Sequence, residues 1–184
     1  MAVVNGLEVN DMMKMLENVK RNPASAKATL YATTNWKSGF RNEAEISNFT
    51  MGGAKLKHAS TFKIEGDQPK DFLGTDKGPA SVEILLAALG HCISNNWAMF
   101  GANMGVSIES LRLEVEGDID IQGRMGLPEP GKVRPGYQII RITHYVKSKA
   151  PKEKLEQLKQ MAEDRSPTKD SLRAVSFSSK LVIE

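Results

Sequence analysis

The chain has 184 residues, of which 40% are hydrophobic and 26% are charged, and it carries a net charge of +3. This composition is typical of one globular domain, and the dispersal of basic residues among acids argues against a nucleic-acid partner. A single cysteine cannot form an intrachain disulfide, so a reducing, cytoplasmic setting is expected. The sequence shows neither a signal peptide nor an apolar stretch long enough to span a membrane.

The N-terminal part of the chain is expected to form one helix and three strands. The helix has apolar residues at helical spacing. The strands are rich in β-branched and aromatic residues and are separated by turns that contain glycine. In the third strand, Leu56, Phe62 and Ile64 are expected to point inward. The helix is expected over residues 11–22 and the strands over 26–36, 40–49 and 55–66.

A long helix is predicted over residues 80–103, after a loop rich in proline, glycine and aspartate. Pro79 lies near the start of this helix, and Gly105 is placed to end it. Residues 84–93 are apolar around most of the helix circumference, so the helix should be buried rather than amphipathic. In a chain of this size, a partner subunit is one simple source of the cover that such a helix needs.

Two long antiparallel strands are predicted in the C-terminal half. Polar and apolar residues alternate over residues 106–121 and again over 137–148, where His144 continues the apolar set. A link rich in glycine and proline joins the two segments.

A second helix and a last strand complete the expected elements. Pro151 opens the helix over residues 151–165, and the chain closes with a strand over 172–184. The Lys159–Glu163 pair of this helix is interpreted as part of a solvated face. Because the strands and helices are segregated along the chain, the fold is expected to be α+β.

Motifs for nucleotides and metals are missing from the sequence. No G-x-G-x-x-G and no phosphate-binding loop occurs, so no cofactor is expected. The three histidines, His58, His91 and His144, are far apart in the sequence. His91 and Cys92 are adjacent, and adjacent helical side chains point about 100° apart, which makes them a poor chelating pair. We therefore expect no metal site.

Cys92, the single cysteine, lies within the predicted buried helix, and the residues alone leave two interpretations. Free cysteine is commonly inert packing. A nucleophile must be a thiolate, and with a pKa of about 8.5 only a few per cent is thiolate at neutral pH, so a nearby cation would be needed. Asn95 and Asn96 share the Cys92 side of the helix. Whether they line a pocket or satisfy a buried polar group is left open.

The stretch DQPKDFLGTDKGPASVEILLAALGHC, residues 67–92, resembles the central signature of the OsmC/Ohr family, the osmotically inducible and organic hydroperoxide resistance proteins. In that family, a loop with an acidic residue and proline leads into a Pro-x-x-x-Glu-Leu-Leu-Ala-Ala-Leu-Gly-x-Cys helix. Residues 1–25 are accordingly interpreted as a helical extension and residues 26–184 as an OsmC-like domain. The matching residues are Pro79, Glu83, Leu85, Leu86, Ala87, Ala88, Leu89, Gly90 and Cys92.

The resemblance implies an intertwined α+β homodimer, with antiparallel sheets around a long central helix and active sites at the subunit interface. It implies that Cys92 is the peroxidatic nucleophile against organic hydroperoxides, that Arg41 stabilises its thiolate and that Glu83 holds Arg41. On one ideal helix, Glu83 and Cys92 face opposite sides. Glu83 would therefore act through Arg41, from a distorted first turn or from the other subunit. The residues alone equally support Glu83 as a first-turn acid that complements the helix dipole.

The sequence departs from the family at Ser166-Pro167, where the resemblance implies a Cys-Pro segment with the resolving cysteine. Serine cannot close a disulfide, so an external thiol would have to resolve the oxidised Cys92. Ser166 itself is interpreted as a helix-terminal or turn hydroxyl. The alternative to an enzyme is a non-catalytic protein that binds an apolar small molecule at the dimer interface. The reactivity of Cys92 separates the two.

Overall fold

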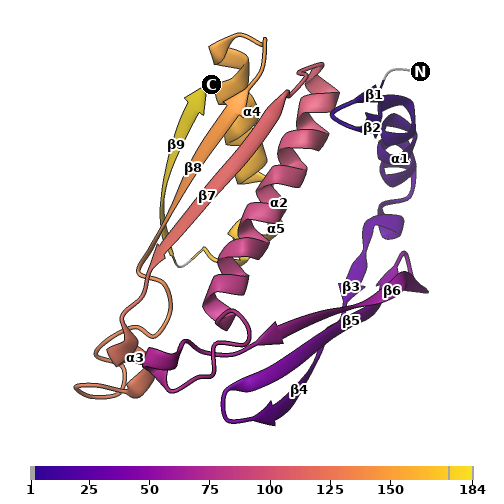
Figure 1. Ribbon diagram of the computed structural model, residues 1–184. Coiled ribbons are helices and arrows are strands. Elements are labelled where there is room, and N and C mark those ends of the chain that lie inside the picture. The colour runs from indigo at the N-terminus through magenta and orange to yellow at the C-terminus, as the bar shows by residue number, and fades with distance from the viewer. Residues whose placement is uncertain (1–2, 174, 184) are drawn as a thin grey trace. The chain divides into compact units, whose positions relative to one another are not determined.

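The computed structural model describes residues 3–173 and 175–183. The chain forms two compact units: one comprises Asn10–Ile84, and the other comprises the residues before it together with the chain from Leu85 onward. Helices and mostly antiparallel strands occur together along the chain, which confirms the expected α+β class (Figure 1).

The Asn10–Ile84 unit is built around β5, the central strand of an antiparallel sheet. β3 and β4 pair with β5 in succession, and β6 pairs with it along the opposite edge. The expected strand over 26–36 is therefore two strands. The elements are α1 (Val9–Arg21), η1 (Pro23–Ala26), β3 (Ala28–Leu30), β4 (Thr33–Ser38), β5 (Arg41–Met51), β6 (Ala54–Gly66) and η2 (Lys70–Phe72).

The inward orientation predicted for β6 is wrong for two of its three residues. Leu56 is 42% exposed and Phe62 is 52% exposed, whereas Ile64 is partly buried. Alternation identifies the two faces of a strand, but it cannot say whether the apolar face is covered by the same chain.

A buried aspartate organises the loop between β6 and the long helix. Asp67 accepts hydrogen bonds from the backbone N–H groups of Gln68, Thr75 and Lys77 and from the Thr75 hydroxyl. Among these contacts, the bond from the Thr75 hydroxyl contributes most to a pKa of Asp67 lowered to about 2. The loop is thus held in shape by one ionised carboxylate.

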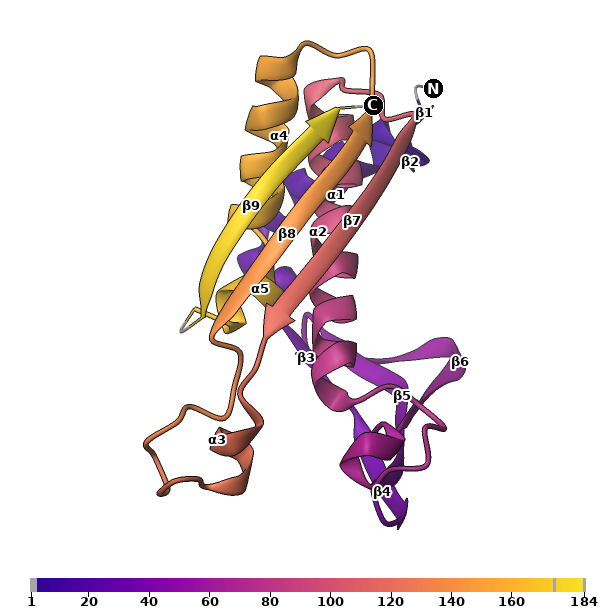
Figure 2. The same ribbon diagram turned by 60° about the vertical axis from the view of Figure 1, so that its left-hand side comes forward.

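The unit that includes Leu85 and the residues after it contains a three-stranded sheet in the order β7-β8-β9 (Figure 2). β7 and β8 are antiparallel, as predicted, and their register places Leu113 opposite His144. β9 runs parallel to β8, because two helices carry the chain across between them. The elements are β1 (Val3–Val4), β2 (Leu7–Glu8), the part of α2 (Ser81–Met104) from Leu85 onward, β7 (Ser110–Asp118), α3 (Ile121–Met125), β8 (Ile139–Lys147), α4 (Lys152–Asp164), α5 (Pro167–Ser171) and β9 (Ser176–Ile183).

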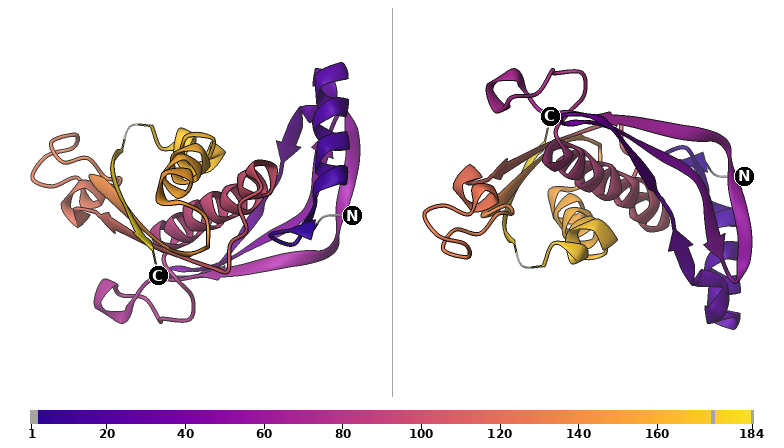
Figure 3. Two further views of the ribbon diagram at one scale, coloured as in Figure 1. Left: turned by 90° about the horizontal axis from the view of Figure 1, so that it is seen from above. Right: turned by 90° about the horizontal axis from the view of Figure 1, so that it is seen from below.

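The core of this unit lies between the sheet and two helices. The part of α2 from Leu85 onward and α4 lie on the same side of the sheet (Figure 3). Apolar side chains of α2, β8 and α4 meet there and are fully buried, so this burial is the main source of stability for the unit. They are Leu89, Ile93, Trp97, Ile140, Ile142, Val146, Leu155 and Leu158.

Helix α2 has nearly the predicted bounds, and Gly105, at φ 67°, follows its last residue. Its burial is less complete than predicted, because Ala87, Ala88 and His91 remain exposed in the single chain.

The Asn5 side chain ties the N-terminal hairpin to the end of α2. Its amide donates to the carbonyls of Ala98 and Val106, and its oxygen accepts the N–H of Ile108.

Candidate active site

Cys92 lies on α2 and is partly exposed. The Ser166 hydroxyl, only 1% exposed, donates a hydrogen bond to Cys92 Sγ at 3.1 Å. The same Ser166 oxygen accepts the N–H of Lys169 at 3.2 Å and is the N-cap of α5. Because the Lys169 N–H occupies a lone pair of the oxygen, the hydroxyl proton remains free for the sulfur.

The surroundings of Cys92 favour its thiolate. Burial, the largest single influence, raises the pKa of the thiol. The hydrogen bonds from Ser166 and from the backbone and side chain of Thr168 lower it by more, so the pKa falls below the ordinary value. The sequence interpretation required a nearby cation for this effect. The structure instead places hydrogen-bond donors from α5 against the sulfur.

The predicted role of Ser166 as a helix-terminal hydroxyl is confirmed, and its contact with Cys92 is an addition that the sequence did not reveal. The family's Cys-Pro segment indicated that position 166 faces Cys92. The sequence interpretation did not consider that a serine at this position can donate a hydrogen bond to the sulfur of Cys92.

Glu83 and Arg41 are both in the Asn10–Ile84 unit, whereas Cys92 is in the other. Glu83 lies in the first turn of α2, where its carboxylate accepts the N–H of Ala80 at 2.7 Å. This contact agrees with the first-turn interpretation, since a carboxylate there satisfies a free N–H of the helix start. Arg41 begins β5 and is exposed. The approach of Arg41 to Cys92, and its pairing with Glu83, stay predictions.

The two asparagines that follow Cys92 have different surroundings. Asn96 is buried, and its amide donates to the Ala162 carbonyl on α4 at 2.9 Å, so it satisfies a buried polar group. Asn95 is exposed. The Asn96 bond fixes α2 to α4 one turn beyond Cys92.

A buried polar network lies next to α5, centred on Glu163, which is only 4% exposed. Glu163 Oε2 lies 2.7 Å from Lys169 Nζ, and Glu163 Oε1 accepts the Ser179 hydroxyl. Oε1 also lies 3.2 Å from Lys159 Nζ. The interpretation of Lys159–Glu163 as a solvated pair is therefore wrong, because this part of α4 faces the sheet.

His144 connects the Glu163 network to the centre of the core. Trp97 Nε1 donates to His144 Nδ1 at 3.0 Å, which assigns the proton of a neutral ring to Nε2. Nε2 lies 3.1 Å from Glu163 Oε1. Burial raises the pKa of Glu163, but contacts with His144, Lys169 and Ser179 outweigh it and hold the pKa well below its usual range.

Two features of the sequence pointed to buried titratable residues, although neither was interpreted in that way. His144 occupies an inward position of an alternating strand, and Glu163 follows the apolar stripe of α4 at Leu155 and Leu158. A titratable residue at such a position must be paired if it is buried.

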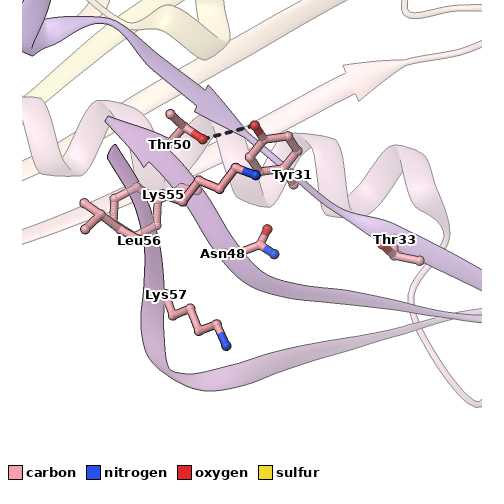
Figure 4. A pocket seen from close by; sticks show the side chains of 8 residues that line it. Tyr31, Thr33, Asn48, Thr50, Lys55, Leu56 and Lys57 are labelled. Carbon is pink, nitrogen blue, oxygen red and sulfur yellow. Dashed lines mark hydrogen bonds between the residues drawn. The ribbon is translucent and has the colours of Figure 1, made fainter. Parts of the chain in front are cut away.

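A hollow of ≈ 480 Å³ lies on the β-sheet of the Asn10–Ile84 unit (Figure 4). The Tyr31 hydroxyl and the Thr50 hydroxyl are hydrogen-bonded at its side, and Lys55 and Lys57 line it. The lining contains no cysteine and no carboxylate. The other lining residues are Thr33, Asn48, Phe49 and Leu56.

Within residues 3–173 and 175–183, no three histidine, cysteine, aspartate or glutamate side chains gather as a metal site would require. None of the helices in the same described part of the chain combines the length and the apolar character needed to cross a membrane.

Residues 74–180 match the model of a protein family described as OsmC-like protein. The chain belongs to this family. The matched segment is more than half of the chain and contains Cys92, Ser166 and the whole Glu163 network. A search of curated proteins by sequence gives no match.

Solved OsmC-like structures have the same fold. An OsmC-like protein from Mycoplasma pneumoniae has a TM-score of 0.63 at 17% identity, over 85% of this chain and 96% of that one. An organic hydroperoxide resistance protein OsmC from Legionella pneumophila has a TM-score of 0.55 at 14% identity, over 84% and 96%. An organic hydroperoxide resistance protein from Elizabethkingia anophelis has a TM-score of 0.59 at 12% identity, over 85% and 96%. At these identities the likeness shows the fold alone.

Proposed function

We propose that this OsmC-like protein is a thiol-dependent peroxidase that reduces organic hydroperoxides through Cys92. The observation that carries the proposal is the partly exposed Cys92 thiol, whose sulfur accepts a hydrogen bond from the Ser166 hydroxyl. Such donors stabilise the anion that must attack the peroxide. The names of the Legionella and Elizabethkingia structures support the choice of hydroperoxides as the substrate class.

In the proposed reaction, the Cys92 thiolate attacks one oxygen of the peroxide. An S–O bond forms as the O–O bond breaks, and the departing alkoxide takes a proton and leaves as an alcohol. The sulfur loses two electrons and becomes a sulfenic acid. A first external thiol condenses with the sulfenic acid, which releases water and gives a mixed disulfide. A second external thiol attacks the sulfur of the first, so that the two external thiols leave as a disulfide and Cys92 returns to its reduced state.

Ser166 assists the first step and cannot perform the second. Its hydroxyl donates to Cys92 Sγ in the reduced protein, but an oxygen cannot take the place of the resolving sulfur. The external thiol therefore belongs to the proposal as a co-substrate, and a reducing cytoplasm is the setting that supplies it. Arg41 is proposed to stabilise the thiolate and Glu83 to hold Arg41.

We also propose that the protein acts as a homodimer. In the Asn10–Ile84 unit, Leu30 is 79% exposed, Trp36 is 73% exposed and Phe62 is 52% exposed. These large apolar side chains are exposed in the single chain, and a second copy would bury them. The exposed Ala87, Ala88 and His91 of α2 add to the area that a second copy would cover.

The direct test is the mass of the intact protein after one equivalent of cumene hydroperoxide in the presence of a sulfenic-acid trap. We expect one trapped adduct on the wild-type chain and none on Cys92→Ser. Arg41→Gln should form the adduct more slowly, whereas Lys55→Gln, which removes a lysine from the hollow of Figure 4, should not. If Cys92 stays a thiol in excess hydroperoxide, the peroxidase proposal is wrong, and binding of an apolar molecule at the dimer interface becomes the better hypothesis.

A further inference from the structure

The segment that carries the donors to Cys92 is too short to be stable alone. α5 has five residues, and an isolated helix of that length does not form in water. Contacts with the rest of the protein must therefore set its position. The position matters because Ser166 and Thr168, at the start of α5, supply the hydrogen bonds to the sulfur.

Lys169 joins α5 both to Ser166 and to Glu163. Its backbone N–H is bonded to Ser166 Oγ at 3.2 Å, and its ammonium donates to Glu163 Oε2 at 2.7 Å. The Lys169 side chain is 21% exposed and that of Glu163 is 5% exposed, so solvent screens this ion pair only weakly. The pair links α5 to α4 by a charge-assisted hydrogen bond.

Three further side chains contact the Glu163 carboxylate and hold it in place. Its Oε1 accepts the hydroxyl of Ser179 on β9, and it lies 3.1 Å from His144 Nε2 on β8 and 3.2 Å from Lys159 Nζ on α4. One carboxylate therefore connects α5 to the helix before it and to two strands of the sheet. A surface ion pair with the same two residue types would not hold α5 in this way.

We propose that Glu163 is a positioning residue for Cys92: by holding Lys169, it fixes α5 so that the Ser166 hydroxyl points at the sulfur. The inference deepens the proposed function and rests on it, because positioning the sulfur serves a reaction only if Cys92 is the nucleophile. Glu163 touches neither the sulfur nor the substrate in this scheme and acts through Lys169 and Ser166.

Replacing the charged Glu163 by a neutral residue distinguishes two possible roles: positioning of α5, and a direct effect of the negative charge on the Cys92 thiolate. If Glu163 acted on Cys92 only through its negative charge, Glu163→Gln would favour the thiolate and speed alkylation of Cys92. If Glu163 positions α5, the same substitution loosens the donors and slows alkylation. The two roles therefore predict opposite changes in the alkylation rate.

The experiment measures the rate at which iodoacetamide alkylates Cys92 between pH 5 and pH 10, in the folded full-length protein. Loss of one hydrogen bond to the thiolate corresponds to a factor of about five in the thiolate fraction. We therefore expect Glu163→Gln and Lys169→Gln to slow alkylation about fivefold at neutral pH. Lys169→Arg should restore most of the rate. His91 is adjacent to Cys92 in the sequence, so each profile is repeated with His91→Gln as a second control.

Lys159→Gln is the matched control. It removes a positive charge that pairs with the same carboxylate, but this ion pair lies within α4 and does not reach α5 directly, and Ser179 and His144 still contact Glu163 Oε1. Its effect on the alkylation rate should be less than about twofold. Lys169→Gln also keeps the test decisive if Glu163→Gln fails to fold, because the Lys169 side chain is the more exposed of the two.

The inference is overturned if Glu163→Gln alkylates as fast as the wild type or faster, or if Lys159→Gln slows the reaction as much as Lys169→Gln. The proposed function fails separately. A wild-type Cys92 that alkylates readily but resists cumene hydroperoxide would contradict the peroxidase proposal while leaving the positioning result intact.

Discussion

The contact between Ser166 and Cys92 can be tested by making it covalent. Ser166→Cys places a second sulfur where an oxygen now lies 3.1 Å from Cys92 Sγ. A disulfide requires the two sulfurs to approach by about 1 Å more, part of which the longer C–S bond supplies. We expect this variant to form an intrachain disulfide on mild oxidation, in a chain whose natural sequence cannot form one.

The size of the expected stabilisation follows from the separation of 74 residues between the two positions, which corresponds to about 4 kcal/mol in the chain-entropy relation for cross-links. For a chain of this length, 1 kcal/mol shifts Tm by about 3 °C, so oxidised Ser166→Cys should melt about 10 °C above its reduced form. Comparing the two redox forms of one variant cancels the cost of losing the serine cap on α5.

Intact mass and thiol titration would detect the disulfide, and thermal melts with and without reductant would give its stabilisation. Ser171→Cys is the control, since Ser171 is on the same short helix but its hydroxyl donates to the Pro167 carbonyl. If Ser166→Cys keeps two free thiols under oxidation, or cross-links no faster than Ser171→Cys, then Ser166 does not face Cys92 and the site geometry is wrong.

Three further predictions concern the elements that support the site. Leu158→Ala removes a fully buried side chain of α4 and should lower the free energy of unfolding by about 3 kcal/mol, measured by urea titration. Asn5→Ala removes three hydrogen bonds between the N-terminal hairpin and the end of α2. It should cost about 1–3 kcal/mol in the same assay, and a cost near zero would contradict the described tie. The folded-state pKa of Asp67 is about 2, below its ordinary 3.8, so its stabilisation is complete above pH 3.8 and is lost as the pH falls through 2. Asp67→Asn should remove this acid dependence from the urea midpoint between pH 2 and pH 4, and an unchanged acid profile would refute the assignment.

Much of the fold could be predicted from periodicity. Helix α2 was expected over 80–103 and spans Ser81–Met104, and the alternating segments became β7 and β8 in the expected antiparallel pair. Patterns of this kind report which side of an element is apolar. They do not report direction within a sheet, so the parallel placement of β9 was not foreseen. The boundary at residue 25 between extension and domain stays a prediction.

The sequence alone identified only the part of the candidate site that a single residue marks. Cys92 is unique in the chain and lies in the family signature, so it could be identified without a structure. The Glu163 network could not be assembled in this way: His144 and Glu163 each stand at an apolar position of their element, but that they contact each other follows only from the packing of α4, β8, β9 and α5. Helical spacing pairs Glu163 with Lys159 equally well on a solvated face and on a buried one.

The separation between Cys92 and α5 has a consequence for biosynthesis. A chain is made from its N-terminus, so Cys92 is synthesised long before Ser166, Thr168 and Lys169. A nascent or truncated chain that ends before α5 contains the thiol but none of the described donors, and its cysteine has the reactivity of an ordinary one. Under the proposed function, the thiol therefore acquires its reactivity late, when the segment that carries Ser166 folds against α2. A chain that is still incomplete is protected in this way from the chemistry that the finished protein is proposed to perform.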